Sequence, residues 1–383
     1  MNLTYSLNLG SRIKPSDTGK EKMIMASRFW TPKTWIILGG LTLGILASLL
    51  TKWGNPANMG ICVACFYRDI TGGLGLHRAG VVQYIRPEIM GFVFGALISA
   101  FAFREFRPRG GASPIIRFFL GVFFMIGALV FLGCPIRALI RLAGGDLNGI
   151  TALLGVIVGA AVGILFLKGG YNLGRAGSVS KISAFMIPLI MLGLLLLIIF
   201  KPHFLFFSQK GPGAQYAPIL VSLLVGIFTG FVAQKTRMCF VGGWRDIMLV
   251  RDFYLFSGIA AFFVGVLVCN CALGNFASGF YHWGFDHQPV SHNNHLWNFL
   301  GMVLAGLAAT LLGGCPLRQT ILASEGDTDA GVAILGLIVG AAFAHNFLLA
   351  SSPKGPGEFG PVAVIIGLIF CSVVGFLMME REK

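Results

Sequence analysis

Residues 132–137 read LGCPIR and residues 313–318 read GGCPLR, so a Gly-Cys-Pro-X-Arg motif occurs twice, 181 positions apart. The same offset relates LGVIVGAA at 154–161 to LGLIVGAA at 335–342. Two matches in the same order and at the same spacing predict that the chain is internally duplicated.

A second pair of motifs supports the duplication. Cys62 precedes YRDI at 67–70, and Cys239 precedes WRDI at 244–247, at an offset of 177. In both copies the cysteine lies six residues before the arginine.

The amino-acid composition indicates whether these repeats lie in a soluble protein or in a membrane protein. Of the 383 residues, 56% are hydrophobic and 11% charged, and the mean hydropathy is +0.80. Soluble domains contain roughly a quarter charged residues, and disordered chains combine low hydrophobicity with high charge. Both classes are excluded, which leaves a polytopic membrane protein.

Apolar stretches long enough to cross a ~30 Å hydrocarbon core occur about ten times. They fall roughly at 34–51, 86–103, 114–132, 149–168, 181–200, 216–234, 254–275, 297–313, 329–349 and 361–379. Each half then contributes five spans, an odd number, so the second half must enter the membrane with opposite polarity. We expect an all-α fold of nine to ten spans, built as two inverted five-helix repeats whose re-entrant or broken half-helices meet near the midplane.

This arrangement divides the chain into three parts. We expect a cytoplasmic tail at 1–33, a first transmembrane repeat at 34–205 and a second at 206–383. The tail carries six cations and lacks the apolar core of a signal peptide.

The net charge of +14 fits the same topology. With both termini inside, cytoplasmic segments hold 20 of the 29 Lys and Arg residues, as the positive-inside rule requires. The cations gather at the ends of apolar runs, so we expect a cytoplasmic (inner) membrane protein and no nucleic-acid partner.

The Gly-Cys-Pro motif has a direct structural meaning. Glycine lets one helix stop, and proline is suited to the first position of the next helix. Cys134 and Cys315 would then lie at helix N-termini, where unpaired N–H groups attract anions. A thiol is a weak, polarisable donor that suits a large soft anion. The alternative is a simple helix break with inert buried cysteines.

Four arginines occupy matching places in the halves, and we place them among the candidate substrate-binding residues. Arg137 and Arg318 follow the cap cysteines by three residues, and Arg68 and Arg245 each precede an aspartate. They either draw an anion inward or, for the Arg-Asp pairs, form a loop charge pair.

Cys62 and Cys65 form a C-x-x-C sequence. No second pair or histidine pair accompanies it, so we predict no metal site. A redox role remains open, because such pairs exchange disulfides. Cys65 has no partner in the second half, where Gly242 aligns.

We assign structural roles to the other cysteines and histidines. We interpret Cys269, Cys271 and Cys371 as packing residues, and His345 as a satisfied residue at the end of a span. An exposed polar loop is expected to hold the remaining histidines considered, namely His282, His287, His292 and His295.

The absence of several common catalytic motifs argues against the enzyme classes that these motifs define. There is no P-loop, no H-E-x-x-H and no G-x-S-x-G, so neither an ATPase nor a common hydrolase is predicted, and no cofactor is expected. No convincing acidic residue occurs in the middle of a span to suggest a coupling ion.

The combined motifs NMGICVACFYRD at 58–69, RMCF at 237–240 and the two Gly-Cys-Pro-X-Arg sequences resemble the YeeE/YedE sulfur-transport family. The resemblance is closest to its YedE-related selenium-metabolism membrane proteins and covers nearly the whole chain after the tail.

The resemblance implies thiosulfate uptake, with re-entrant loops meeting at the waist of the protein and cysteine thiols passing the anion along. It assigns this role to Cys62, Cys134, Cys239 and Cys315. The selenium branch implies a selenium compound that feeds cytosolic selenophosphate synthesis. Proline after Cys134 and Cys315, and the extra Cys65, depart from the thiosulfate pattern.

The leading hypothesis is a transporter, and not an enzyme, that moves a soft sulfur- or selenium-containing anion inward through the bilayer. A cytosolic sulfur or selenium carrier and a homodimer are compatible with it. The alternatives are a membrane thiol–disulfide or sulfur-transfer enzyme using Cys62 and Cys65, and a channel for a small solute.

Overall fold

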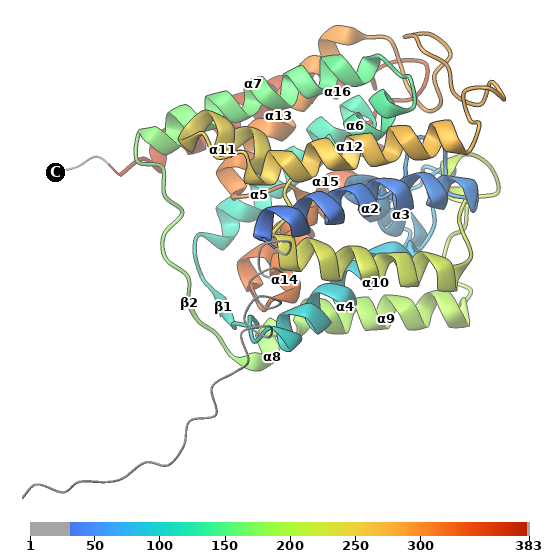
Figure 1. Ribbon diagram of the computed structural model, residues 1–383. Coiled ribbons are helices and arrows are strands. Elements are labelled where there is room, and N and C mark those ends of the chain that lie inside the picture. Colours follow the sequence, from blue (N-terminus) through green and yellow to red (C-terminus); the bar gives the residue numbers. More distant parts are fainter. Residues whose placement is uncertain (1–30, 381–383) are drawn as a thin grey trace, which may run out of the picture.

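The computed structural model describes residues 31–380 and is almost entirely helical (Figure 1). Eight segments of this part of the chain are long and apolar enough to cross a membrane, and two shorter apolar helices, α4 (Pro87–Ala102) and α9 (Met186–Phe200), accompany them. The eight segments are α2 (Pro32–Lys52), α5–α6 (Pro114–Ala143), α7 (Asn148–Lys168), α10 (Ile219–Thr236), α12 (Tyr254–Ala272), α13–α14 (His295–Ser324), α15 (Thr328–Asn346) and α16 (Gly360–Leu377). The protein is an all-α polytopic membrane protein. Most of the expected cytoplasmic tail, residues 1–30, lies outside the described residues.

Four short helices interrupt this pattern of long ones: α3 (Val63–Gly73), α6 (Pro135–Ala143), α11 (Gly242–Val250) and α14 (Pro316–Ser324). Helix α6 continues α5 (Pro114–Phe131) after a break, and α14 continues α13 (His295–Leu312) in the same way. Proline begins both α6 and α14, as the motif predicts.

The first break is made differently from our expectation. The residue that ends α5 in the left-handed conformation is Leu132 (φ 71°), and not the motif glycine, Gly133. In the second half Gly313 (φ 87°) takes this position. A bulky side chain at positive φ is strained, so the first break is held by its surroundings.

The long helices pack in four pairs: α2 with α12, α4 with α10, α5 with α15, and α7 with α13. Each pair joins one helix from before residue 205 with one from after it. Glycines allow the backbones to approach closely: a Cβ on Gly40 would lie 2.2 Å from the Gly258 oxygen, and one on Gly44 would lie 2.2 Å from the Phe262 oxygen. The contact positions advance together along both helices, so α2 and α12 run parallel.

The helices of the other three pairs also run parallel. A Cβ on Gly91 would meet Leu223 and one on Gly95 would meet Ile227, so α4 and α10 are parallel. Glycines give corresponding parallel contacts in the other two pairs, Gly336 with Phe118 and Gly340 with Val122 (α5–α15), and Gly155 with Phe299 and Gly159 with Val303 (α7–α13).

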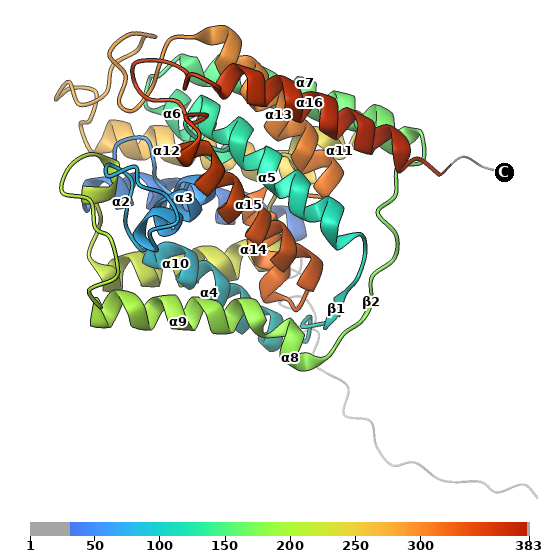
Figure 2. The ribbon, with the colours of Figure 1, turned by 180° about the vertical axis from the view of Figure 1, so that it is seen from behind.

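The molecule has two distinct ends. The strand end carries a small antiparallel ribbon of β1 (Arg109–Gly110) and β2 (Gly177–Ser178), together with α8 (Lys181–Ala184) and the last turn of α16 (Figures 1 and 2). The loop end carries the long connection from α12 to α13, residues 273–294. In Figure 1, α3 and α6 lie toward the loop end, and α11 and α14 lie toward the strand end.

Candidate functional site

Each short helix follows a cysteine: α3, α6 and α14 begin directly after Cys62, Cys134 and Cys315, and α11 begins three residues after Cys239. The N–H four residues later donates to the cysteine carbonyl in all four cases: Phe66 to Cys62 (3.0 Å), Ala138 to Cys134 (3.1 Å), Gly243 to Cys239 (3.1 Å) and Gln319 to Cys315 (3.0 Å). The thiols of Cys62, Cys134 and Cys315 make no capping bond to their own helices. The first-turn N–H groups therefore give these sites a positive potential that the thiols do not neutralise.

Three of the predicted thiols meet in a first thiol cluster of Cys62, Cys65 and Cys134. The Cys62 sulfur lies 2.8 Å from that of Cys65 and 3.5 Å from that of Cys134. All three side chains are fully buried. The fold thus joins α3 and α6, whose cysteines are 72 positions apart in the sequence.

The other two predicted cysteines form a second thiol pair, Cys239 and Cys315. The Cys239 sulfur accepts from the Cys315 backbone N–H (3.3 Å) and from that of Gly242 (3.2 Å). Both residues are buried. Because α11 and α14 lie toward the strand end, while α3 and α6 lie toward the loop end, one group of thiols lies closer to each end (Figure 1).

Arg137 joins the first thiol cluster. Its guanidinium donates to the Cys65 sulfur (3.4 Å), to the Asn58 carbonyl (3.1 Å) and to the Leu132 carbonyl. The side chain is 1% exposed, yet no carboxylate within residues 31–380 lies within 4 Å of its nitrogens. A buried cation without a counter-charge favours an incoming anion.

The matching arginine of the second half is neutralised. Arg318 forms an ion pair with Glu325 at 3.2 Å, and its side chain is 12% exposed. The two halves therefore differ in charge, although their sequences match at this motif.

The Arg-Asp pairs are not loop charge pairs, and this alternative is wrong. Arg68 and Asp69 lie within α3 and are buried, and Arg86 shares the same carboxylate at 2.8 Å. Arg245 and Asp246 also lie on a helix, α11, but are 25% and 19% exposed. Two arginines on one aspartate leave an excess of positive charge near the first thiol cluster.

Sequence reasoning missed several buried charges. Arg141 and Asp146 form a fully buried pair at 2.6 Å, and Glu88 is fully buried in the first turn of α4, bonded to Asn55 and Ser222. The spacing of Arg137 and Arg141, which places both on one face of a short apolar helix, was the available signal. Glu88 was not recognised as an acidic residue in the middle of a span because it lies near the start of the expected span 86–103.

Three minor expectations are also corrected. Cys271 is exposed on the helix surface and does not pack in the core, whereas Cys371 and Cys269 are buried. His292 is buried, with Nε2 2.9 Å from the Val130 carbonyl oxygen, while His282, His287 and His295 are exposed as expected. His345 is not satisfied, because its buried Nε2 has no hydrogen-bond partner within the described chain.

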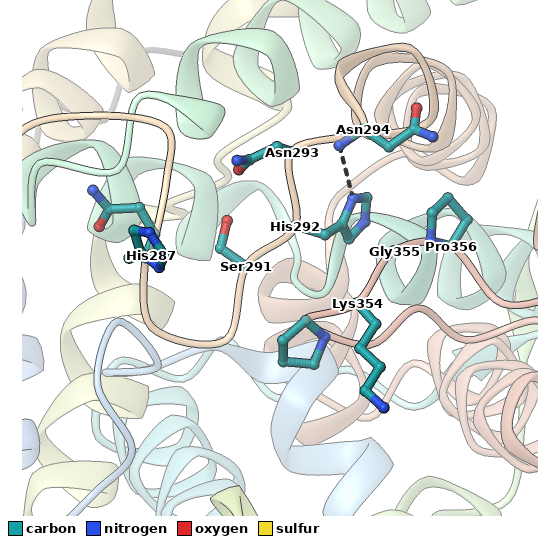
Figure 3. Close-up of a pocket in the computed structure, with 10 residues that line it drawn as sticks. His287, Ser291, His292, Asn293, Asn294, Lys354, Gly355 and Pro356 are labelled. Atoms are coloured by element: carbon teal, nitrogen blue, oxygen red, sulfur yellow. Dashed lines mark hydrogen bonds between the residues drawn. The ribbon is translucent and has the colours of Figure 1, made fainter.

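A basin of 630 Å³ opens at the loop end (Figure 3). It brings together polar side chains of the α12–α13 connection and of the loop before α16, among them Ser291, His292, Asn293 and Lys354. Within the described residues, no group of three His, Cys, Asp or Glu side chains is placed to hold a metal ion.

Comparison with known proteins assigns the family. The family described as "Sulphur transport" matches residues 235–377, a segment that contains both cysteines of the second thiol pair. An uncharacterized protein of Methanocaldococcus jannaschii is 32% identical over 90 residues, 21% of this chain and 85% of that protein. The chain belongs to the sulphur transport (YeeE/YedE) family.

Other relatives in this family carry functional names. The thiosulfate transporter TsuA of Spirochaeta thermophila is 34% identical over 123 residues, 32% of this chain and 35% of that protein. TsuA of Escherichia coli is 30% identical over 130 residues, 33% of this chain and 34% of that protein. The match thus spans about a third of the length of these two transporters.

Proposed function

We propose that this member of the sulphur transport family carries a soft sulfur- or selenium-containing anion across the cytoplasmic membrane into the cell. The observation that carries the proposal is Arg137, a buried cation without a carboxylate partner in the described chain, which donates to the Cys65 sulfur at 3.4 Å. Thiols and helix N-termini around it supply further weak donors. Together they favour a polarisable anion over a strongly hydrated one.

The two groups of thiols suit stepwise passage. An anion would bind first at Cys62, Cys65 and Cys134, and then at Cys239 and Cys315, where Gly242 and Cys315 direct backbone N–H groups toward a sulfur. Thiols donate weakly, and conduction needs several sites that each release the ion readily. The first thiol cluster lies near more uncompensated positive charge than the second thiol pair. We therefore assign the initial capture of the anion to the first thiol cluster.

The proposed polarity rests on the parallel helix pairs. Consecutive spans run in opposite directions, so α10 and α12 are antiparallel in the proposed topology. Since α2 is parallel to α12, it is antiparallel to α10, its counterpart in the repeat. This supports two halves of opposite orientation, at 34–205 and 206–383. The excess of Lys and Arg in the expected cytoplasmic segments supports the placement of both termini in the cytoplasm.

The substrate is proposed at the level of its chemistry. The two named relatives are thiosulfate transporters, and the resemblance to the selenium branch extends the candidates to a selenium compound. A cytosolic sulfur or selenium carrier, or a selenophosphate-synthesis protein, would then receive the anion.

Uptake into proteoliposomes tests the proposal, with radiolabelled thiosulfate and radiolabelled selenium oxyanions as separate probes. We expect Cys134→Ala and Cys315→Ala to reduce uptake at least tenfold each, and Cys371→Ala, a buried cysteine outside both thiol groups, to retain it. Full uptake by the double variant would remove the thiol pathway. The probe that is transported decides between sulfur and selenium.

A thiol–disulfide function is the competing outcome, and the 2.8 Å between the Cys62 and Cys65 sulfurs is the observation in its favour. It predicts that Cys65→Ala abolishes activity and that a disulfide appears during turnover, detectable by thiol-labelling mass spectrometry. A transporter with a weak thiol donor at this position should retain uptake in Cys65→Ala within about tenfold.

A further inference from the structure

A small cavity of 130 Å³ lies beside the first break in the helices. Its walls are mainly apolar, and Arg68 on α3 and His345 on α15 are its two basic groups. One water occupies about 30 Å³ in the liquid, so the space is large enough for a few waters or one small tetrahedral anion. We call this cavity the chamber.

One of the two basic groups of the chamber, His345, is incompletely bonded. The buried Nε2 of His345 has no partner within the described chain, and the ring lies 4.4 Å from that of His77. His77 in turn contacts the Arg68 carbonyl oxygen at 3.1 Å. A buried polar atom without a partner is costly, so an anion accepting a hydrogen bond from His345 would satisfy it. Positive charge from Arg68 and Arg86, which share Asp69, favours such an anion.

The chamber adjoins two features already described. Its lining includes Leu132, next to the Gly133–Cys134 break, and the Leu132 carbonyl accepts from Arg137. Its lining also includes Pro353, which lines the basin at the loop end as well, and the next residue in the chain is the exposed Lys354 (Figure 3).

We propose that the chamber is an anion-binding site through which a small sulfur or selenium anion passes from the basin to the first thiol cluster. His345 and Arg68 hold the anion there. The direction of passage rests on the proposed transport function, but occupancy of the chamber by an anion does not.

Substitution of His345 tests the binding role. In proteoliposomes, His345→Leu should raise the half-saturating thiosulfate concentration about tenfold, and His345→Gln, which keeps an N–H donor, should restore most of it. His203→Leu, at an exposed histidine elsewhere on the loop end, is the matched control and should match the parent. An unchanged half-saturating concentration in folded His345→Leu overturns the proposal.

Chemical modification of a single introduced cysteine tests the route of the anion, because the chamber is blocked only after the protein has folded. Ser351 lines the chamber and Ser278 lies exposed away from it. In a Cys271→Ser background, an impermeant methanethiosulfonate should reduce uptake by Ser351→Cys at least tenfold below that of the treated parent, and leave Ser278→Cys equal to it. Equal uptake by all three rejects the chamber as the route.

The outcomes separate this proposal from the proposed function. If Cys134→Ala and Cys315→Ala lose uptake while both chamber tests are negative, transport through the thiols stands and the anion enters elsewhere. If the cysteine variants transport normally but His345→Leu weakens thiosulfate binding to the purified protein, the chamber stands and the thiol pathway is wrong.

Discussion

Arg137 and Arg318 occupy the same place in two copies of one motif, but the protein gives them different surroundings. Arg137 is buried among backbone carbonyls and a thiol, whereas Arg318 has Glu325 beside it. A buried cation without a counter-ion raises the free energy of the empty protein. In the proposed function, a bound anion would offset this cost at Arg137, and no such cost arises at Arg318.

Removing this charge should weaken ligand-induced stabilisation. At a ligand concentration of 100 times Kd, binding stabilises a protein by about 2.7 kcal/mol. We expect thiosulfate to raise the melting temperature of the parent in detergent and to have little effect on Arg137→Gln. Arg251→Gln, at an exposed arginine, should respond like the parent. An undiminished shift in Arg137→Gln would contradict an anion site at this residue.

The Arg-Asp repeat allows a matched comparison of a fully buried ion pair and a partly exposed one. Asp69 is fully buried and accepts from two arginines, and Asp246 is 19% exposed and accepts from Arg245. Asp69→Asn should lower the free energy of unfolding by about 3–5 kcal/mol, because it leaves buried cations uncompensated. Asp246→Asn should lower it by about 1 kcal/mol or less. Reversible unfolding in mixed micelles measures both, and equal losses would contradict the burial argument.

Helix pairing through glycine is the main device at the scale of the elements. Water does not drive apolar helices together within a membrane, so close van der Waals packing takes its place. In the α4–α10 pair a Cβ on Gly95 would lie 1.9 Å from the Ile227 oxygen. The two backbones are thus in contact where a side chain would separate them, and this contact holds a helix of the first half against one of the second.

A methyl group at this contact should be destabilising. Gly95→Ala forces the helices apart and should cost about 1–3 kcal/mol in unfolding free energy. Gly193 in α9 is the control, since a Cβ there meets no atom within 4 Å. Gly193→Ala should be neutral or stabilising by up to about 1 kcal/mol, because alanine favours the helix. Thermal unfolding of the two variants side by side gives the answer, and equal stability would reject the packing argument.

Two thiol groups displaced along one axis, with a basin at the loop end, give the whole molecule a direction. The segment His295–Ser324 is the most buried of the eight candidate spans in the described chain, and Cys315 at the second break is buried. Ion pairs such as Arg109–Asp327 tie the strand end together around the end of α14. The loop end carries the basin.

The proposed orientation places the strand end in the cytoplasm. A green fluorescent protein fused after Lys383 should therefore fluoresce, because it folds in the cytosol. A cysteine at the exposed Trp283 in the α12–α13 connection should react with an impermeant maleimide on intact cells, and one at exposed Arg175 should not. The opposite labelling pattern would reverse the assignment of inside and outside.

Much of this protein follows from local sequence. Composition alone predicts a polytopic membrane protein, and Gly-Cys-Pro predicts the helix starts at Cys134 and Cys315, because proline and glycine constrain the backbone wherever they occur. The motif does not predict that Leu132 ends α5 in the left-handed conformation, because glycine would adopt that conformation more easily and the surroundings hold Leu132 in it.

Only the tertiary structure decides which groups meet. It brings Cys62 to Cys134, leaves Arg137 without an acid among residues 31–380 while giving Arg318 a partner, and buries Glu88, Asp69 and the Nε2 atom of His345. These relations depend on contacts between helices far apart in the chain, and a residue's own neighbours in sequence carry no information about them. The sequence by itself therefore determined the membrane fold and the candidate thiols, and the packing of the two halves decided the charge and connectivity of the site.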